Sequence, residues 1–217
     1  MSPETIVVTG GAGYIGSHTV SALLDLGYQV HVIDNFRESR NNIIKHAHVT
    51  YHEVDICNKA ALEEVFSLVR PDVVFHFAAL ASVPDSMSNP SAYYETNVVG
   101  GLNLLECMRK QGSSKIIFSS SASTYGEPQT EIITEDHPQE PTNTYGYTKL
   151  VFEHMLKDYH RAYGLSSISL RYFCASGCDV VKSLGEYHTP ETHVIPSIIE
   201  TILGKRETFF VYGNQLS

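Results

Sequence analysis

One short stretch of the sequence decides the fold: Gly10-Gly11-Ala12-Gly13-Tyr14-Ile15-Gly16. It follows the β-branched run 6–9, and after it apolar residues recur with helical spacing over 14–26. Glycines at this spacing let the backbone turn tightly and approach a pyrophosphate, which then faces the free N–H groups at the start of the helix. The stretch therefore predicts a strand, a phosphate-binding loop and a helix. A glycine-rich turn without a ligand is the alternative.

The rest of the chain alternates between strand and helix signals. We predict strands over 30–33, 49–54, 73–77, 116–118 and 168–170, and helices over 62–69, 93–111 and 145–163. The strands are continuously apolar, which is typical of a parallel sheet covered on both faces. The predicted fold class is therefore α/β, a doubly wound parallel sheet of the Rossmann type. Beyond Cys174 we expect an irregular region, a helix over 197–203 and a strand over 209–212.

The composition argues against several classes of function. Lys and Arg total 15 against 24 Asp and Glu, a formal charge of −9, which disfavours a nucleic-acid partner and an anionic membrane. The N-terminus lacks the features of a signal peptide, and no apolar run reaches the ~20 residues of a membrane span. We predict that the 4 cysteines are free thiols and that the chain is cytoplasmic. His46, His48 and His52 cluster without metal-ligand spacing, so we predict no metal.

An acidic residue follows the second predicted strand. Asp34 comes directly after the run 30–33. A carboxylate at this place accepts hydrogen bonds from the adenosine ribose hydroxyls and repels a 2′-phosphate. Together with the glycine stretch, Asp34 predicts a site for NAD in preference to NADP.

Two side chains of one predicted helix suit proton transfer. Tyr145 and Lys149 are spaced i, i+4, which places them on the same helix face. A phenol with a pKa of ~10 is a poor base at neutral pH, and a cation at ~5 Å lowers that pKa by roughly two units. Ser121 follows the strand 116–118, at the ligand-binding edge of a parallel sheet, where its hydroxyl can relay a substrate proton. We predict Tyr145 as a general base assisted by Lys149 and Ser121; an exposed helix pair is the alternative for the tyrosine and lysine alone.

Further segments extend this pattern along the chain. They are, in order, 9–18, 34–35, 55–56, 76–79, 93–94 with Asn97, 119–122 with 125–126, 145–149 and 171–173. In these motifs the chain resembles the extended short-chain dehydrogenase/reductase family, and within it the nucleotide-sugar 4-epimerases. The resemblance implies an NAD-binding Rossmann-like domain over 1–174 and the beginning of a smaller substrate-binding lobe over 175–217, with the rest of that lobe missing.

The resemblance also implies roles for individual residues. The catalytic set would be Ser121, Tyr145 and Lys149. NAD would be contacted by Gly10, Gly13, Tyr14, Ile15, Gly16, Asp34, Asn35, Asp55, Ile56, Phe77, Ala78, Ala79, Asn97, Ser121, Tyr145, Lys149 and Phe173. The nucleotide-sugar pocket would be lined by Ser121, Tyr145, Cys174, His193, Val194, Phe210, Val211 and Tyr212.

The activity implied by the resemblance is an isomerase reaction of galactose metabolism. Tightly bound NAD takes a hydride from a UDP-sugar and returns it to the other face of a transient 4-keto sugar, which interconverts UDP-glucose and UDP-galactose. Another UDP-sugar epimerase or reductase of the family, and a non-catalytic NAD-binding protein, are the alternatives. Related dehydratases carry acidic residues where this chain has Ala122 and Ser123, so elimination of water is disfavoured. The helices 93–108 and 145–163 carry more apolar residues than one sheet-covering face needs, and relatives pair through these helices, which implies a homodimer; plain core packing is the alternative.

Two positions depart from the family pattern. Cys174 stands where these epimerases have an asparagine that helps to hold the substrate, and a thiol is a weaker hydrogen-bonding group. Ala81 stands where many relatives have a polar or cationic residue, which removes one cofactor contact. Because the missing part of the lobe would grip the nucleotide and orient the sugar, we expect turnover in a complete protein and little in these 217 residues alone.

Overall fold

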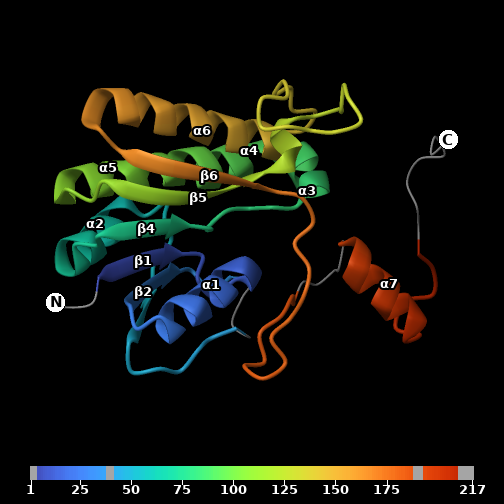
Figure 1. Cartoon of the computed structure of the whole chain (residues 1–217), viewed down its shortest axis with the longest axis horizontal. Helices are drawn as coiled ribbons and strands as arrows, with labels where there is room; N and C mark the ends of the chain where they lie inside the picture. Colours follow the sequence, from blue (N-terminus) through green and yellow to red (C-terminus); the bar gives the residue numbers. More distant parts are fainter. Residues whose placement is uncertain (1–3, 38–41, 188–192, 210–217) are drawn as a thin grey trace.

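A parallel β-sheet lies at the centre of the computed structural model, which describes residues 4–37, 42–187 and 193–209. Its strands are β1 (Thr5–Thr9), β2 (Gln29–Asp34), β3 (Val49–Glu53), β4 (Val73–His76), β5 (Lys115–Ser121) and β6 (Ser166–Tyr172). They lie in the order β3-β2-β1-β4-β5-β6 (Figure 1). All five pairings are parallel. This order confirms the predicted doubly wound sheet, and it reverses between β1 and β4. Sheets of this kind bind ligands at the carboxyl ends of the strands beside such a reversal, the region called the crevice below.

Helices connect the strands. They are α1 (Tyr14–Asp25), α2 (Lys59–Val69), α3 (Val83–Ser88), α4 (Pro90–Tyr93), the π-helical η1 (Tyr94–Gly100), α5 (Gly101–Gln111), the 3₁₀ turn η2 (Ala122–Thr124), α6 (Thr144–Tyr163) and α7 (Val194–Ile202). The prediction of one long helix over 93–111 is confirmed, and the structure adds that Tyr94–Gly100 is π-helical. The short helix α3 was not predicted, although Ser82 caps it and Pro84 lies in its first turn. The helix predicted over 197–203 begins earlier, at Val194.

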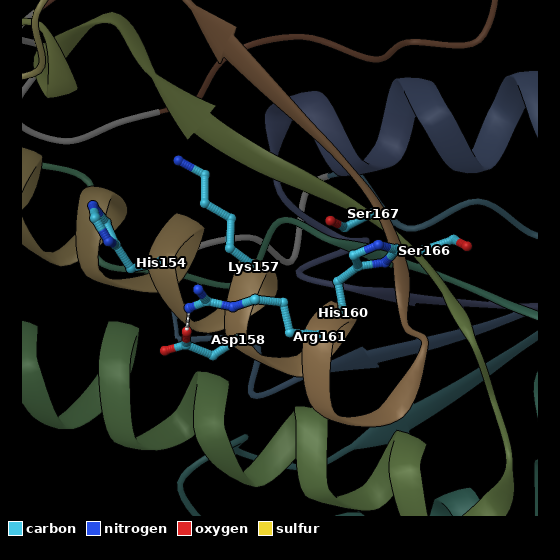
Figure 2. A pocket seen from close by; sticks show the side chains of 7 residues that line it. All are labelled: His154, Lys157, Asp158, His160, Arg161, Ser166 and Ser167. Carbon is cyan, nitrogen blue, oxygen red and sulfur yellow. Dashed lines mark hydrogen bonds and ion pairs between the residues drawn. The ribbon is translucent and has the colours of Figure 1, made fainter.

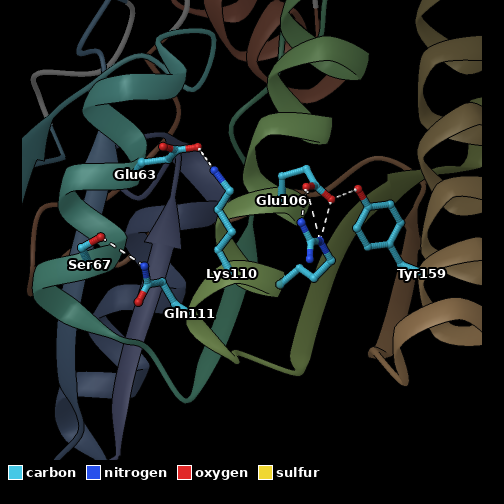
Figure 3. A network of polar contacts seen from close by, with 7 residues as sticks. Glu63, Ser67, Glu106, Lys110, Gln111 and Tyr159 are labelled. Atoms are coloured by element: carbon cyan, nitrogen blue, oxygen red, sulfur yellow. Dashed lines mark hydrogen bonds and ion pairs between the residues drawn. The ribbon is translucent and has the colours of Figure 1, made fainter.

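The helices α2, α5 and α6 cover one face of the sheet. Their apolar residues pack on it in the larger core, together with Val7, Ile33, Val74, Ile116 and Phe118 from the strands. Polar contacts join the three helices on their outer side, as Figure 3 shows. Lys110 Nζ donates to Glu63 on α2 (2.6 Å), and Tyr159 on α6 donates to Glu106 on α5 (2.6 Å). Apolar packing thus holds this layer on the sheet, and polar contacts link its helices to one another at the surface.

The opposite face is covered over part of its width. Helix α1 packs there on β1 and β2, in a smaller core that includes Val20, Leu23 and Val32. On β6 at the edge of the sheet, Ile168 and Leu170 are 59% and 37% exposed. The prediction of a sheet covered on both faces is therefore wrong at this edge, because within the described residues no helix lies over these two side chains.

A long loop joins η2 to α6 and is closed at its base. Gly126 pairs with Glu140 in an isolated parallel bridge. A Cβ on Gly126 would lie 1.8 Å from the Glu140 carbonyl oxygen, and the φ of Gly126 is +69°. Only glycine fits this close crossing of two backbones without strain. The two ends of the loop are thereby held together beside the carboxyl end of β5.

The chain after β6 is irregular, as predicted, and returns to the first half of the molecule. Asn42 exchanges two hydrogen bonds with the backbone of Gly185 (3.0 and 3.2 Å), and Lys182 pairs with Asp25 at 2.5 Å. The strand predicted over 209–212 lies largely outside the described residues, and Phe209 itself is not in a strand. The division into domains at residue 174 stays a prediction.

Candidate active site

The glycine stretch forms a tight turn between β1 and α1. A Cβ on Gly16 would lie 2.1 Å from the Gly10 carbonyl oxygen, and one on Gly10, whose φ is +68°, 2.5 Å from the Ala78 nitrogen. Helix α1 begins after Gly13, which supplies no side-chain hydrogen bond to its first turn. The N–H groups there point out of the helix start, where the helix dipole favours an anion. The residues present therefore fit a phosphate group.

Asp34 ends β2 beside this turn, and its side chain is buried. One carboxylate oxygen accepts from the Ala12 nitrogen (3.0 Å) and the other from the Phe36 nitrogen (2.9 Å). Burial raises the pKa of Asp34, and these backbone hydrogen bonds partly offset the effect. Asp34 thus holds the glycine turn against β2, a structural role that was not predicted. Each of its oxygens retains acceptor capacity for a ribose hydroxyl.

A second acidic residue lies close to the end of β2. Asn35 donates to Asp55 at 2.9 Å, and the other oxygen of Asp55 accepts from the Cys57 nitrogen at 2.9 Å. Burial alone would raise the pKa of Asp55, but these hydrogen bonds outweigh it and lower the pKa. The neighbouring Ile56 is buried against Gly100 of η1. The structure therefore brings Asn35, Asp55 and Ile56 together, as their predicted shared role requires.

The predicted catalytic residues meet where β5 ends and α6 begins. Asn143 caps α6 by accepting from the Gly146 nitrogen (2.8 Å). A Cβ on Gly146 would lie 2.5 Å from the Ser123 carbonyl oxygen, so a glycine here lets the helix start directly against the segment after β5. In this arrangement the phenol of Tyr145 lies near the Ser121 side chain, and its interaction with Ser121 favours the phenolate. The pairing of Tyr145 with Ser121 is the central contact of the site.

Lys149 lies one turn further along α6 and is only 3% exposed. Its ammonium donates to the Ser119 carbonyl oxygen (2.8 Å) and lies 5.6 Å from the centroid of the Tyr145 ring. Burial lowers the pKa of Lys149 to about 7. Burial also raises the pKa of Tyr145, and its interaction with Ser121 offsets the effect in part. The predicted lowering of the Tyr145 pKa by Lys149 is thus not seen, because desolvation is the larger effect.

Asn97 lies within η1 and is buried. Its amide nitrogen donates to the Leu80 carbonyl and to Thr148 Oγ1 (both 3.0 Å), and its oxygen accepts from the Leu80 nitrogen (2.9 Å). These contacts use both amide donors, so Asn97 ties the segment after β4 to α6. Only the Asn97 side-chain oxygen, which can accept a second hydrogen bond, remains available for the predicted contact with the cofactor. Phe77, Ala78 and Ala79 directly follow β4, and all three are partly exposed at the crevice edge.

Phe173, predicted to contact the cofactor, is exposed directly beyond the carboxyl end of β6. Apart from Ser121 and Tyr145, the predicted substrate residues follow it in the chain, and the first of them, Cys174, is also exposed. His193 precedes α7 and pairs with Glu186 (2.7 Å), and Val194 is exposed at the first position of that helix. Phe210, Val211 and Tyr212 lie outside the described residues. The substrate role of this group stays a prediction.

A hollow of about 760 Å³ lies elsewhere, on the outer side of α6 (Figure 2). It is lined by His154, Lys157, Asp158, His160, Arg161, Ser166 and Ser167. Ser166 and Ser167 begin β6, so the hollow lies at the amino end of that strand. Ligands of open parallel sheets bind at the carboxyl ends. The hollow is therefore not part of the candidate site.

Two functional candidates were missed in the sequence, Glu153 and Arg171. They form an ion pair (2.8 Å) beside the catalytic residues, in which Glu153 is buried and Arg171 is partly exposed. The available signal was the position of Glu153, which continues the i, i+4 series of Tyr145 and Lys149. An acid on the buried stripe of a helix requires a partner.

The fold and the site together define a doubly wound α/β protein with a glycine turn that fits a phosphate group and with a tyrosine and a lysine at the carboxyl edge of its sheet. Residues 6–216 match the NAD dependent epimerase/dehydratase family, and the chain belongs to that family. It is 43% identical over 214 residues to a UDP-glucose 4-epimerase of Rhizobium leguminosarum bv. trifolii, covering 99% of this chain and 65% of that protein. A UDP-glucose 4-epimerase of Halalkalibacterium halodurans is 45% identical over 209 residues, covering 96% and 62%.

Solved structures show the same likeness. The crystal structure of UDP-glucose 4-epimerase from Brucella ovis in complex with NAD superposes with a TM-score of 0.92 at 43% identity, covering 97% of this chain and 64% of that chain. The structure of UDP-glucose 4-epimerase with UDP-glucose from Thermotoga maritima gives a TM-score of 0.74 at 41% identity, covering 77% and 55%. The chain thus spans less than two thirds of the length of these relatives.

Proposed function

We propose that this chain belongs to an enzyme that interconverts UDP-glucose and UDP-galactose with tightly bound NAD. The observation that carries the proposal is the placement of Tyr145, Ser121 and the buried Lys149 together at the carboxyl edge of the sheet, with the Lys149 ammonium 5.6 Å from the centroid of the Tyr145 ring. Relatives at 43% and 45% identity carry the name UDP-glucose 4-epimerase, and the Brucella ovis relative is a complex with NAD. These names support the choice of substrate and cofactor.

The cofactor would be held by the two sides of the crevice. The uncapped start of α1 after Gly13 would receive the pyrophosphate, and Asp34 would accept from the adenosine ribose. When bound, NAD would accept a hydride from C4 of the sugar and return it, and its oxidised ring would add positive charge to the site. Asp34 would also repel a 2′-phosphate, which is why we propose NAD and not NADP.

The chain's own residues would move the proton. Ser121 would hold the 4-hydroxyl oxygen of the sugar, and Tyr145 would take its proton as the C4 hydride departs. The C–H bond at C4 and the O–H bond of the 4-hydroxyl are broken, and C4 becomes a carbonyl carbon. After the keto-sugar has turned, Tyr145 returns the proton to the 4-oxygen as the hydride returns to C4. Since burial raises the pKa of Tyr145, nearby positive charge is needed, and a protonated Lys149 would contribute it. Ala122 and Ser123 offer no carboxyl group for elimination.

We further propose a homodimer in the cytoplasm. Exposed apolar side chains on η1, α5 and α6 support the dimer, among them Val99, Leu102, Tyr147 and Val151. Such a cluster on one helical layer suits a twofold contact. The cytoplasmic location is supported by four cysteines that are all free. Among the described helices, none is long and apolar enough to cross a membrane.

The activity is tested by adding UDP-galactose to the purified protein and measuring UDP-glucose. Replacing Tyr145 by Phe removes the general base and is expected to lower turnover by roughly 10²- to 10⁴-fold. Tyr147→Phe is the matched control, because Tyr147 lies on the same helix with its side chain exposed. Equal losses in both variants, or conversion by neither variant nor the parent, would count against the proposed role of Tyr145.

The cofactor is tested separately by denaturing the protein and identifying the released nucleotide. We expect NAD from the parent protein and none from Gly16→Ala, whose Cβ would collide with the Gly10 carbonyl oxygen. Release of NADP would refute the interpretation of Asp34. Bound NAD without any turnover would favour a non-catalytic NAD-binding protein, and turnover of another UDP-sugar alone would favour a different epimerase or reductase.

A further inference from the structure

Glu153 is a buried acid that the proposed reaction does not use. It lies on the same stripe of α6 as Tyr145 and Lys149, and it is 2% exposed. Its carboxylate accepts four hydrogen bonds: from Ser120 Oγ (2.5 Å), from Arg171 Nε (3.0 Å) and Nη2 (2.8 Å), and from Gln139 (3.1 Å). Burial alone would raise the pKa of Glu153, but the bonds from Arg171 and Ser120 outweigh it and lower the pKa. The acid is therefore ionised and fully paired.

Arg171 extends these contacts from β6 to the loop before α6. Its Nη1 donates to the Tyr125 hydroxyl (2.9 Å) and to the Glu135 carbonyl oxygen (3.0 Å). The guanidinium also lies 5.0 Å from the centroid of the Tyr125 ring. One ion pair thus joins α6, β5, β6 and the loop that follows η2. Its charges cancel each other locally, so its influence on the site is geometric.

The geometry concerns how α6 is aligned along β5. Lys149 binds the Ser119 carbonyl oxygen, and Glu153 binds the hydroxyl of the next residue, Ser120. The residue after that is Ser121, which meets Tyr145. Two successive contacts therefore fix the helix against the strand immediately before the reacting pair. A displacement of about 1 Å between catalytic groups can cost ~10²-fold in rate.

We propose that the ion pair of Glu153 and Arg171 is a positioning element that aligns Tyr145 with Ser121 and so acts on proton transfer, not on the binding of cofactor or nucleotide. The inference deepens the proposed function and rests on it for the identity of the reaction. If the ion pair served stability alone, its removal would lower the thermal midpoint and leave the alignment of Tyr145, kcat and KM unchanged.

The experiment compares three variants of the protein as purified with its bound nucleotide. Ser120→Ala removes one contact of Glu153 and leaves the ion pair in place. Glu153→Gln removes the charge and retains an amide oxygen in place of one carboxylate oxygen. Glu63→Gln is the matched control, because Glu63 forms a surface ion pair with Lys110 on the outer side of the same helical layer. For each we measure the released nucleotide, the thermal midpoint, kcat and KM, and the ionisation of Tyr145.

The ionisation of Tyr145 is read as the phenolate absorbance of each protein minus that of the same protein carrying Tyr145→Phe. We expect Ser120→Ala to lower kcat about tenfold and Glu153→Gln about 100-fold, with KM and nucleotide content within twofold of the parent. The Tyr145 titration moves to higher pH in both, since the misaligned phenol loses part of the interaction with Ser121 that favours the phenolate. Glu63→Gln matches the parent in every measurement.

The inference is overturned if Ser120→Ala and Glu153→Gln lower the thermal midpoint while kcat and the Tyr145 titration stay at parent values. It is also overturned if the loss falls on KM or on nucleotide content. Should Glu153→Gln not fold, Ser120→Ala decides alone. If the parent protein holds no NAD and shows no turnover, the proposed function is wrong. The Tyr145 titration of Ser120→Ala tests the alignment independently of that result.

Discussion

The two faces of the central sheet differ in how completely helices cover them. On one face, α2, α5 and α6 pack over the larger core. On the other face, within the described residues, α1 packs over β1 and β2 in the smaller core. The covered face includes α6, the helix that holds Tyr145, Lys149 and Glu153. The proposed chemistry is thus placed on a helix that contributes Phe152 and Leu156 to the larger core. Rigid placement of catalytic groups requires this kind of support.

We expect the largest loss of stability from Phe152→Ala on the fully covered face. The Phe152 ring is buried, lies 4.5 Å from the Phe118 ring centroid, and packs against Gly101 of α5. Its truncation should lower the free energy of unfolding by about 4 kcal/mol, measured by urea denaturation. Lys157→Ala, at an exposed position of the same helix outside the apolar cluster of the proposed dimer contact, is the control and should cost less than about 1 kcal/mol. Similar costs for the two would show that α6 is not anchored as described.

The face under α1 should respond less. Leu23 is buried in the smaller core, and Leu23→Ala should cost about 3 kcal/mol. Leu26, which follows the same helix and is largely exposed, gives the control, and Leu26→Ala should change the free energy of unfolding by less than about 0.5 kcal/mol. A cost for Leu23→Ala above that of Phe152→Ala would reverse the ranking of the two faces.

Acid should weaken the covered face selectively. His76 on β4 is buried between Phe118 and Phe152, bonded to Thr9, and burial followed by the charge of Lys149 lowers its pKa to about 3. The unfolded chain binds this proton near pH 6.5 and the folded chain does not, so stability is full above that pH and falls as pH drops towards 3. Between pH 7 and 5 the loss is about 2 kcal/mol. The same titration of His76→Gln should lack this part of the loss; an identical acid limb would show that His76 is not held neutral.

The smallest effect is expected at the edge of the sheet. Ile168 on β6 is exposed, and Ile168→Thr keeps a β-branched side chain. The free energy of unfolding should change by less than about 0.5 kcal/mol. Ile116→Thr on the buried side of β5 is the comparison and should cost several times more. A large cost at Ile168 would reveal that a second copy or another segment covers this edge in solution.

Most of the sheet and its crevice could be predicted from local patterns. The glycine stretch, the apolar strands and the i, i+4 pair of Tyr145 and Lys149 each depend on neighbours in sequence, and each was placed correctly. The π-helical turn around Asn97 could not be predicted, because an apolar helical pattern does not separate the two kinds of helix. The exposure of Ile168 depends on which segments pack over β6, and the pKa of Tyr145 depends on its depth of burial. Arg171 became meaningful only once the fold had brought it to Glu153.

The bridge between Gly126 and Glu140 has a consequence for how the chain could be divided. The loop tip between them is exposed around Ile132, so a protease would cut there first. Both cut ends would stay attached, since Gly126 faces Glu140 at the base and Arg171 holds the Glu135 carbonyl oxygen. Residues before the cut would supply β1 to β5, and residues after it would supply α6 and β6. The protein should therefore tolerate production as two separate polypeptides that reassemble into one folded body.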